Sequence, residues 1–404
     1  MSSLPVFDPF GVEAIDDPYP QYRRWREADP LHWSEKLRSW VVFRYDDVAA
    51  FFRDDRRLSS DRSKAARFKR RGTTDAIPSL RTVASDPPDH TPVRAILNAC
   101  LGPRVRGIGA QVDNVIERLL DRLGEATRRA VEQVDLRGEV DLIADFAYPL
   151  PITVIADLLD VPEGDRPQFQ ASSHAVARGM DRFFSAPDAS RGLHEIGAYF
   201  LQLVQQRHGS AGDDLVHRLL GTDYDGQRLN DLEVVAMCTA LVFGGHETTV
   251  NLIGNGMLAL LREPQQLQDL KSTPTLIDSA VEELLRYDSP AQLISRCAVD
   301  DFEWHDKRIV AGDSVLGCLG AANHDPAVFE RPDDLNLSRA PNPHLAFGLG
   351  THFCPGAQLS RIEARAAVAT LVRRFPKIRL GRTPPVRRPT AVLRGLERLS
   401  VRLD

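Results

Sequence analysis

The sequence has few features of a secreted or membrane-anchored protein. It has no uninterrupted apolar run of about 20 residues, the length that a helix needs to cross a bilayer. The first residues do not join a basic segment to an apolar one, so no signal peptide is predicted. The cysteines are odd in number and widely separated: Cys100, Cys238, Cys297, Cys318 and Cys354. This distribution does not fit a disulfide framework and indicates a cytoplasmic protein with reduced thiols.

An excess of basic residues is also lacking. Lys and Arg number 51 against 56 Asp and Glu, which gives a net charge of −5 at pH 7. Nucleic-acid-binding domains usually carry a basic surface, so we expect no nucleic-acid partner. The sequence contains no repeat, low-complexity tail or linker between domains. We therefore expect residues 1–404 to form one domain. We also expect the protein to be a monomer.

Residues 343–365 place one cysteine between a glycine-rich loop and a helix. Gly348, Gly350 and Gly356 allow backbone conformations that side chains would block. From Pro355 onward apolar residues recur at helical spacing, and proline is favoured at the first position of a helix. Cys354 is then expected at a helix N-terminus, where free amides favour a thiolate. A thiolate is either a nucleophile or a metal ligand. No other cysteine stands at the spacing of a zinc finger.

The pattern Phe-x-x-Gly-x-x-x-Cys-x-Gly, formed here by Phe347, Gly350, Cys354 and Gly356, resembles the haem-binding loop of the cytochrome P-450 family. The resemblance implies that Cys354 is the axial iron ligand of haem b, with Phe347 and Gly356 beside the cofactor. It places His352 near a haem propionate. It also implies a mainly α fold with a small β-rich lobe, in which haem lies between a long central helix and the cysteine loop. A thiolate ligand favours cleavage of the O–O bond.

Two further segments resemble the propionate-binding positions of the family. His90 and Arg94 lie four residues apart on one face of a helix predicted from residue 90 to residue 101. Taken alone, such a pair is usually exposed surface. The pattern Asp-Pro-Pro-x-His-x-x-x-Arg, however, resembles the family segment that binds one propionate, and an arginine suits a carboxylate through two parallel hydrogen bonds. Arg296 falls where the family holds the other propionate.

The longest helical pattern covers residues 230–262, and Asn230 with Glu233 resembles a capping box at its start. A pair of glycines in its middle weakens the helix by roughly 1 kcal/mol each relative to alanine, and a buried Glu247 adds a further cost. A kinked core helix with a hydrogen-bonded glutamate is one interpretation. The other is an opened turn that leaves room for O2. Gly-Gly-x-Glu-Thr resembles the oxygen-activation motif of the family, which implies that Glu247 and Thr248 relay protons and that His246 is structural.

Glu283 and Arg286 are spaced to pair on one helical face. The resemblance implies that this pair is buried, is joined by Arg339, and supports the haem loop. It also assigns the substrate pocket to the central helix, to the segment after residue 288 and to the C-terminal segment: Ala240, Phe243, Gly244, Ala291, Leu293, Ile294, Val392 and Leu393. Met180, Phe183 and Phe184 are weaker candidates on a predicted lid. The basic residues 61–71 suggest a solvated loop or an entrance for an acidic or carrier-bound substrate.

The resemblance as a whole implies a monooxygenase that inserts one oxygen atom from O2 into a small organic substrate. Because no flavin or iron–sulfur motif is present, we expect a separate ferredoxin or flavodoxin as electron donor. Arg94, Arg104 and Arg106 are candidates for its docking patch. A peroxide-driven peroxygenase is one alternative, although it would not need the Glu247–Thr248 relay. A haem-thiolate sensor is another; it would need a second haem ligand, for which the distal stretch offers only His246.

Overall fold

The computed structural model describes residues 6–61, 64, 85–132, 138–169, 171–172 and 187–403. The predicted lid residues Met180, Phe183 and Phe184 lie outside these ranges, as does most of the basic stretch 61–71. In the part of the chain that the structure describes, every helix is too short or too polar to span a lipid bilayer.

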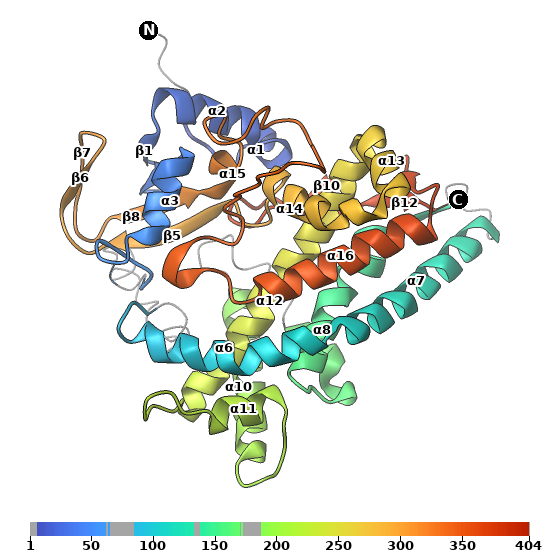
Figure 1. Ribbon diagram of the computed structural model, residues 1–404, viewed down its shortest axis with the longest axis horizontal. Coiled ribbons are helices and arrows are strands. Elements are labelled where there is room, and N and C mark those ends of the chain that lie inside the picture. Colours follow the sequence, from blue (N-terminus) through green and yellow to red (C-terminus); the bar gives the residue numbers. More distant parts are fainter. Residues whose placement is uncertain are drawn as a thin grey trace.

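Helices dominate the described chain, as the sequence predicted. The central helix α12 (Asp231–Arg262) crosses the middle of the molecule (Figure 1) and contacts α8 (Pro149–Leu158), α10 (Pro187–Arg207), α14 (Ile277–Tyr287) and α16 (Ala357–Arg374). Further helices and helical turns are α1 (Val12–Asp16), α2 (Tyr19–Ala28), α3 (Tyr45–Arg53), α6 (His90–Gly107), α7 (Gly109–Glu132), η4 (Ile143–Ala147), η5 (Glu163–Asp165), α11 (Leu215–Gly221), α13 (Pro264–Ser272), η7 (Pro274–Leu276), α15 (Leu319–Ala322) and η8 (Gly350–His352).

Helix α12 begins with the predicted capping box. The amide of Glu233 donates to Asn230 Oδ1 at 3.0 Å, and the amide of Asn230 donates to Glu233 Oε2 at 2.9 Å. This reciprocal arrangement satisfies two backbone donors that have no partner inside the helix. The helix then continues to Arg262, and most of its residues beyond Thr249 are buried. It is therefore a core element along much of its length.

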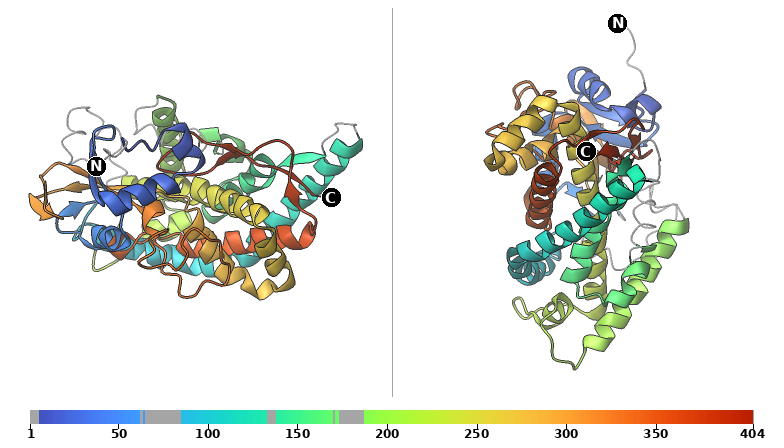
Figure 2. Two further views of the ribbon diagram at one scale, coloured as in Figure 1. Left: turned by 90° about the horizontal axis from the view of Figure 1, so that it is seen from above. Right: turned by 90° about the vertical axis from the view of Figure 1, so that its right-hand side faces the viewer.

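The small β-rich lobe is built around one five-stranded sheet with the strand order β1-β2-β8-β5-β3. Its strands are β1 (Leu31–Ser34), β2 (Ser39–Val42), β3 (Leu58–Ser59), β5 (Leu293–Ala298) and β8 (Ser314–Cys318). Only β2 and β8 pair in parallel. Figure 2 shows this sheet gathered toward one end of the long axis, away from α7. Smaller sheets join β4 (Glu139–Asp141), β12 (Ser400–Arg402) and β9 (Arg379–Leu380), β6 (Phe302–Trp304) and β7 (Lys307–Ile309), and β10 (Val386–Arg387) and β11 (Leu396–Arg398).

The sheet separates two apolar clusters that matter for the site. On one side Phe7, Tyr22 and Trp25 pack with Leu293 from β5. On the other side Phe51, Phe52 and Leu58 pack beneath the loop that precedes α16. Because side chains alternate along a strand, β5 contributes to both clusters. The sheet thereby places Arg296 of β5 next to the end of α3, where it contacts the carbonyl of Phe51.

Candidate functional site

The loop before α16 is held in a conformation that glycine adopts most readily. Gly348 and Gly350 have φ values of +69° and +73°. A Cβ atom on Gly350 would lie only 3.0 Å from the carbonyl oxygen of Phe52, so α3 packs directly against the loop. The amide of Cys354 donates to the carbonyl of Phe347 at 3.0 Å. These contacts fix the cysteine at the end of the loop.

Helix α16 begins at Ala357 and not at Pro355, where the sequence predicted its start. Cys354 therefore lies three residues before the helix. Burial raises the pKa of its thiol, while hydrogen bonds from the amides of Gly356 and Ala357 and the charges of Arg94 and Arg361 act in the opposite direction. The amides at the helix start therefore do favour the thiolate, but burial outweighs them. A Cβ atom on Gly356 would lie 3.9 Å from Cys354 Sγ.

Three buried nitrogen atoms beside the loop have no hydrogen-bond partner among the residues that the structure describes. They are Nδ1 of His90 at the start of α6, Nη2 of Arg296 in β5, and Nε2 of His352 in η8. The rings of His90 and His352 lie 4.3 Å apart between centroids. Buried donors without acceptors are costly and uncommon in folded proteins. Their grouping indicates a place for a ligand with oxygen acceptors.

The electrostatics of this group also fit an anionic ligand. Burial lowers the pKa of His352 to about 4, and the charges of His90 and Arg296 act in the same direction. Burial and Arg94 lower the pKa of His90 as well. Both imidazoles are then neutral near pH 7, and each has one N–H to donate. Together with the Arg296 guanidinium they offer neutral and cationic donors of the kind that bind carboxylates such as haem propionates.

Asp55, which the sequence analysis did not identify, links this donor group to the loop. It accepts a hydrogen bond from Arg296 Nη1 at 3.1 Å and another from the Thr351 hydroxyl. Arg296 Nη1 also donates to the carbonyl of Phe51 at 3.1 Å. The guanidinium is thus fixed through one nitrogen, which leaves Nη2 available. No local pattern marks Asp55, because its partners come from distant segments.

The three arginines considered for a docking patch do not point the same way. Arg94 Nη2 donates to the carbonyl of Phe353 at 2.6 Å, beside the cysteine. Arg104 Nη1 donates to the carbonyl of Asp213 at 2.8 Å, at the start of α11. At 100° per residue, Arg104 and Arg106 lie about 160° apart around α6. Of the three, only Arg94 has a contact with the cysteine loop among the described residues.

One stripe of the central helix is open although its surroundings are buried. Ala240, Gly244 and Thr248 recur every four residues and are partly or fully exposed, and Phe243 beside them is half-buried. A Cβ atom on Gly244 would meet no described residue within 4 Å, whereas one on Gly245 would lie 2.7 Å from Ile155 Cδ1. The first glycine therefore faces open space and the second allows α8 to approach. The helix is continuous at both glycines, so the structure shows no opened turn at this position.

Of the two predicted relay residues, Thr248 belongs to this stripe and Glu247 is buried beside it. Thr248 Oγ1 donates to the carbonyl of Gly244 at 2.5 Å. Glu247 is 2% exposed, and its Oε1 accepts from Arg388 Nη1. Its Oε2 is buried and has no hydrogen-bond partner among the described residues. His246 Nε2 lies 3.2 Å from the carbonyl oxygen of Tyr148, and the two rings pack edge to face. These contacts fit the structural interpretation of His246.

The other pocket candidates come from two segments that meet. Ala291 forms an isolated β-bridge with Leu393, and the amide of Gln292 donates to the carbonyl of Val392 at 2.8 Å. Ile294 is partly buried and packs with the cluster that contains Phe51. Leu293 is different. It is 2% exposed and packs with Phe7, Tyr22 and Trp25 on the other face of β5, so we leave it out of the pocket.

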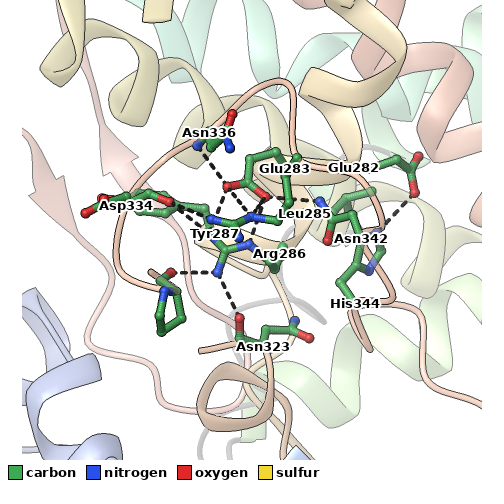
Figure 3. A network of polar contacts seen from close by, with 12 residues as sticks. Glu282, Glu283, Leu285, Arg286, Tyr287, Asn323, Asp334, Asn336, Asn342 and His344 are labelled. Carbon is green, nitrogen blue, oxygen red and sulfur yellow. Dashed lines mark hydrogen bonds and ion pairs between the residues drawn. The ribbon is translucent and has the colours of Figure 1, made fainter. Parts of the chain in front are cut away.

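The predicted ion pair behind the loop is confirmed (Figure 3). Glu283 and Arg286 are fully buried and form two hydrogen bonds of 2.8 Å. Arg339 Nε adds contacts of 3.0 and 3.1 Å to the same carboxylate. Arg286 Nη1 also donates to the carbonyl of Asn323 at 2.9 Å. Asn323 Oδ1 in turn accepts from the amide of Leu345 at 2.7 Å. The network therefore joins α14 to the start of the cysteine loop.

Comparison with known proteins gives a consistent result. Residues 265–395 match the family model described as Cytochrome P-450. The chain is 35% identical to the polyketide biosynthesis cytochrome P-450 PksS of Bacillus subtilis, over 99% of both chains. It is 37% identical to the cytochrome P-450 monooxygenase PikC of Streptomyces venezuelae, over 99% of this chain and 95% of that protein.

Solved structures resemble the whole fold. The structure of PksS from Bacillus subtilis covers 99% of this chain and 100% of that chain, with a TM-score of 0.88 and 35% identity. The structure of P-450BioI in complex with an acyl carrier protein that bears hexadec-9Z-enoic acid covers 97% of this chain and 100% of that chain. Its TM-score is 0.87 and its identity 32%.

Proposed function

Because the chain belongs to the cytochrome P-450 family of oxygen-incorporating oxidoreductases, we propose that it is a haem-thiolate monooxygenase that oxidises a small organic substrate. The observation that carries the proposal is the grouping of unpartnered buried nitrogens from His90, Arg296 and His352 beside Cys354. A cysteine alone would fit many roles. A cysteine beside a built site for carboxylates fits a group that combines a metal with acidic side arms, which haem b does.

In this proposal Cys354 is the iron ligand, and His90, Arg94, Arg296 and His352 hold the propionates. Phe347 and Gly356 would lie against the cofactor beside Cys354. When bound, haem would supply the oxygen chemistry, and the thiolate would favour O–O cleavage. The chain's own contribution is the ligand, the propionate site, the orientation of the substrate and the supply of protons.

Glu247 and Thr248 are the proposed proton relay. Thr248 lies on the open stripe of α12, and Glu247 adjoins it with one buried, unpartnered carboxylate oxygen. The residues proposed to enclose the substrate are Ala240, Phe243 and Gly244 from this helix, Ala291 and Ile294 from β5 and the segment before it, and Val392 and Leu393 from the C-terminal turn. Gly244 presents open space, which suits O2 and a small substrate.

Electrons are proposed to come from a separate ferredoxin or flavodoxin, with Arg94 as the candidate cation nearest the cysteine loop. We further propose that residues 1–404 act as one cytoplasmic, monomeric haem-thiolate domain. A free small molecule is the simplest substrate. A carrier-bound acyl substrate is the second candidate, because P-450BioI was solved with an acyl carrier protein and resembles the whole of this chain.

The first test is the ferrous–CO difference spectrum of purified protein, with Cys354→His as the matched variant. A red-shifted Soret band that is present in the wild type and lost in the variant is expected. A band at shorter wavelength in folded wild type, or absence of haem, would refute the proposal. NADPH consumption and product formation with a ferredoxin system then separate the three functions. A monooxygenase forms product with NADPH, a peroxygenase forms product only with peroxide, and a sensor forms no product. His246 Nε2 is hydrogen-bonded to the Tyr148 carbonyl, which weighs against a sensor that would need His246 as a second haem ligand.

A further inference from the structure

Glu247 of the proposed relay has an arginine partner from a distant segment. Arg388 lies in the turn between β10 and β11, and its Nη1 donates to Glu247 Oε1. The side chains are 15% and 3% exposed. In such a place the removal of one partner leaves a buried charge without compensation, which is strongly unfavourable. The pair therefore constrains both side chains.

Arg388 belongs to the same turn as two proposed pocket residues. The amide of Arg388 donates to the carbonyl of Gly395 at 3.2 Å, and the amide of Thr390 donates to the carbonyl of Arg388 at 2.8 Å. The Thr390 hydroxyl donates to the carbonyl of Leu393 at 2.6 Å. Residues 388–395 thus form one closed turn. Val392 and Leu393 lie against residues 291–292, and Arg388 lies at the base of the turn.

The base of the turn is anchored in the protein core. Arg387 Nη2 and Arg394 Nε donate to the two oxygens of Asp288 at 2.9 and 2.6 Å. Arg394 also donates to the carbonyls of Ile15 and Asp16 at 2.6 and 2.7 Å. Arg387 Nη1 reaches Asn255 Oδ1 of α12 at 2.7 Å. The backbone on both sides of Arg388 is therefore fixed relative to the central helix.

We propose that Arg388 is a positioning residue that couples the pocket turn to the proton relay, an inference that rests on the proposed function. Arg388 holds Oε1 of Glu247, so that Oε2 is the oxygen that exchanges a proton next to Thr248. The anchored turn thereby holds Glu247 in a fixed position relative to the pocket wall that Val392 and Leu393 form.

A merely structural ion pair would behave differently. It would tie the turn to α12, and its loss would lower stability and weaken substrate binding without changing the fate of electrons. A positioning role predicts that proton delivery fails while binding persists. The matched control is Arg398→Gln, because Arg398 is an exposed arginine on the adjacent strand β11, opposite Val386.

The first experiment is a double-mutant cycle of urea unfolding on the haem-loaded protein with Arg388→Gln, Glu247→Gln and the double variant. Arg388→Gln is expected to lower the folded-to-unfolded ratio at least 30-fold alone, but less than threefold in the Glu247→Gln background. Additive effects would show that the pair does not form and would overturn the proposal. This readout does not depend on turnover.

The second experiment follows the relay with two probes. The C–O stretch of the ferrous–CO complex should split or shift in Arg388→Gln, stay unchanged in Arg398→Gln, and not shift further when Arg388→Gln is added to Glu247→Gln. With ferredoxin, its reductase, NADPH and dodecanoic acid, the share of electrons released as hydrogen peroxide should rise at least fivefold in Arg388→Gln. Arg388→Lys should recover part of the loss. The spectral affinity for dodecanoic acid should change less than threefold.

The positioning role would be overturned if Arg388→Gln left the share of electrons released as hydrogen peroxide unchanged. It would also be overturned if the variant lost more than tenfold in affinity for dodecanoic acid while that share stayed at the wild-type value. Failure of the proposed function has a separate signature. The wild type would then lack the red-shifted CO band, while the unfolding cycle would still report whether Arg388 and Glu247 interact.

Discussion

Replacement of Glu283 by glutamine should strongly destabilise the protein, since it removes the negative charge of a fully buried ion pair at the centre of the network. Arg286, Arg339, Asn342 and the amide of Asn336 all donate to this carboxylate. Glutamine has a similar shape and retains one oxygen acceptor. It replaces the other oxygen with an amide group that faces guanidinium N–H donors.

The expected loss in the free energy of unfolding is roughly 3–5 kcal/mol, the usual cost of breaking a buried ion pair by removal of one partner. Because proteins of ordinary stability unfold with about 5–15 kcal/mol, this is a large share of the total. The effect should reach the cysteine loop, since Arg286 donates to the Asn323 carbonyl and the Asn323 side chain accepts from Leu345. Haem content per folded protein should fall together with stability.

The assay is urea unfolding by far-ultraviolet circular dichroism, together with the haem-to-protein absorbance ratio. The matched control is Glu282→Gln, one residue away. Burial alone would raise the pKa of Glu282, but Arg361 and His344 hold it at about 2, and the side chain is 26% exposed. We expect a loss of about 1 kcal/mol there, as for partly solvated pairs. A loss below about 1 kcal/mol for Glu283→Gln, or equal losses for both variants, would refute the reasoning.

Two further predictions follow from α12 and α16. Burial raises the pKa of Glu363 well above its usual value, so above about pH 4.3 the native state holds a proton that the unfolded chain has released, and stability falls as pH rises. Glu363→Gln should therefore increase the urea midpoint, by an amount that grows between about pH 5 and pH 8; a constant difference would contradict this. On α12, Gly244→Ala should stabilise the protein by up to about 1 kcal/mol in thermal unfolding through helix propensity. Gly245→Ala gains the same propensity but should be less stable than Gly244→Ala by roughly 1–3 kcal/mol, because its Cβ atom would lie 2.7 Å from Ile155 Cδ1 and that side chain must shift. The reverse order would be inconsistent with the packing.

The sequence predicted the parts of the site that depend on local spacing. The loop around Cys354, the helix that starts at His90, and the pair of Glu283 and Arg286 each lie within one short segment, where periodicity and motif positions are readable. The capping box of the central helix is of the same kind. The mainly α fold with a small β-rich lobe, which the resemblance to the family implied, is confirmed.

The remaining features depend on contacts between distant segments. Asp55 and Arg296 are 241 residues apart, and Glu247 and Arg388 are 141 apart. No pattern in a single sequence pairs such positions, because their proximity results from the packing of the sheet and the C-terminal turn on the helices. The prediction that Leu293 lines the pocket is wrong for a related reason. Alternation along β5 allows only one of two neighbouring residues to face the site, and which one is decided by the cluster around Phe7.

The contacts of Arg394 with the carbonyls of Ile15 and Asp16 have a practical consequence for anyone who alters the start of the chain. The same arginine clamps the turn that carries Val392 and Leu393, and Tyr19 shares its partner Asp288 through a 2.8 Å hydrogen bond. Deletions, fusions or swapped segments that disturb residues 12–19 would loosen a wall of the proposed substrate pocket from behind. In chimaeras designed to change substrate choice, the first twenty residues should therefore be exchanged together with the C-terminal turn.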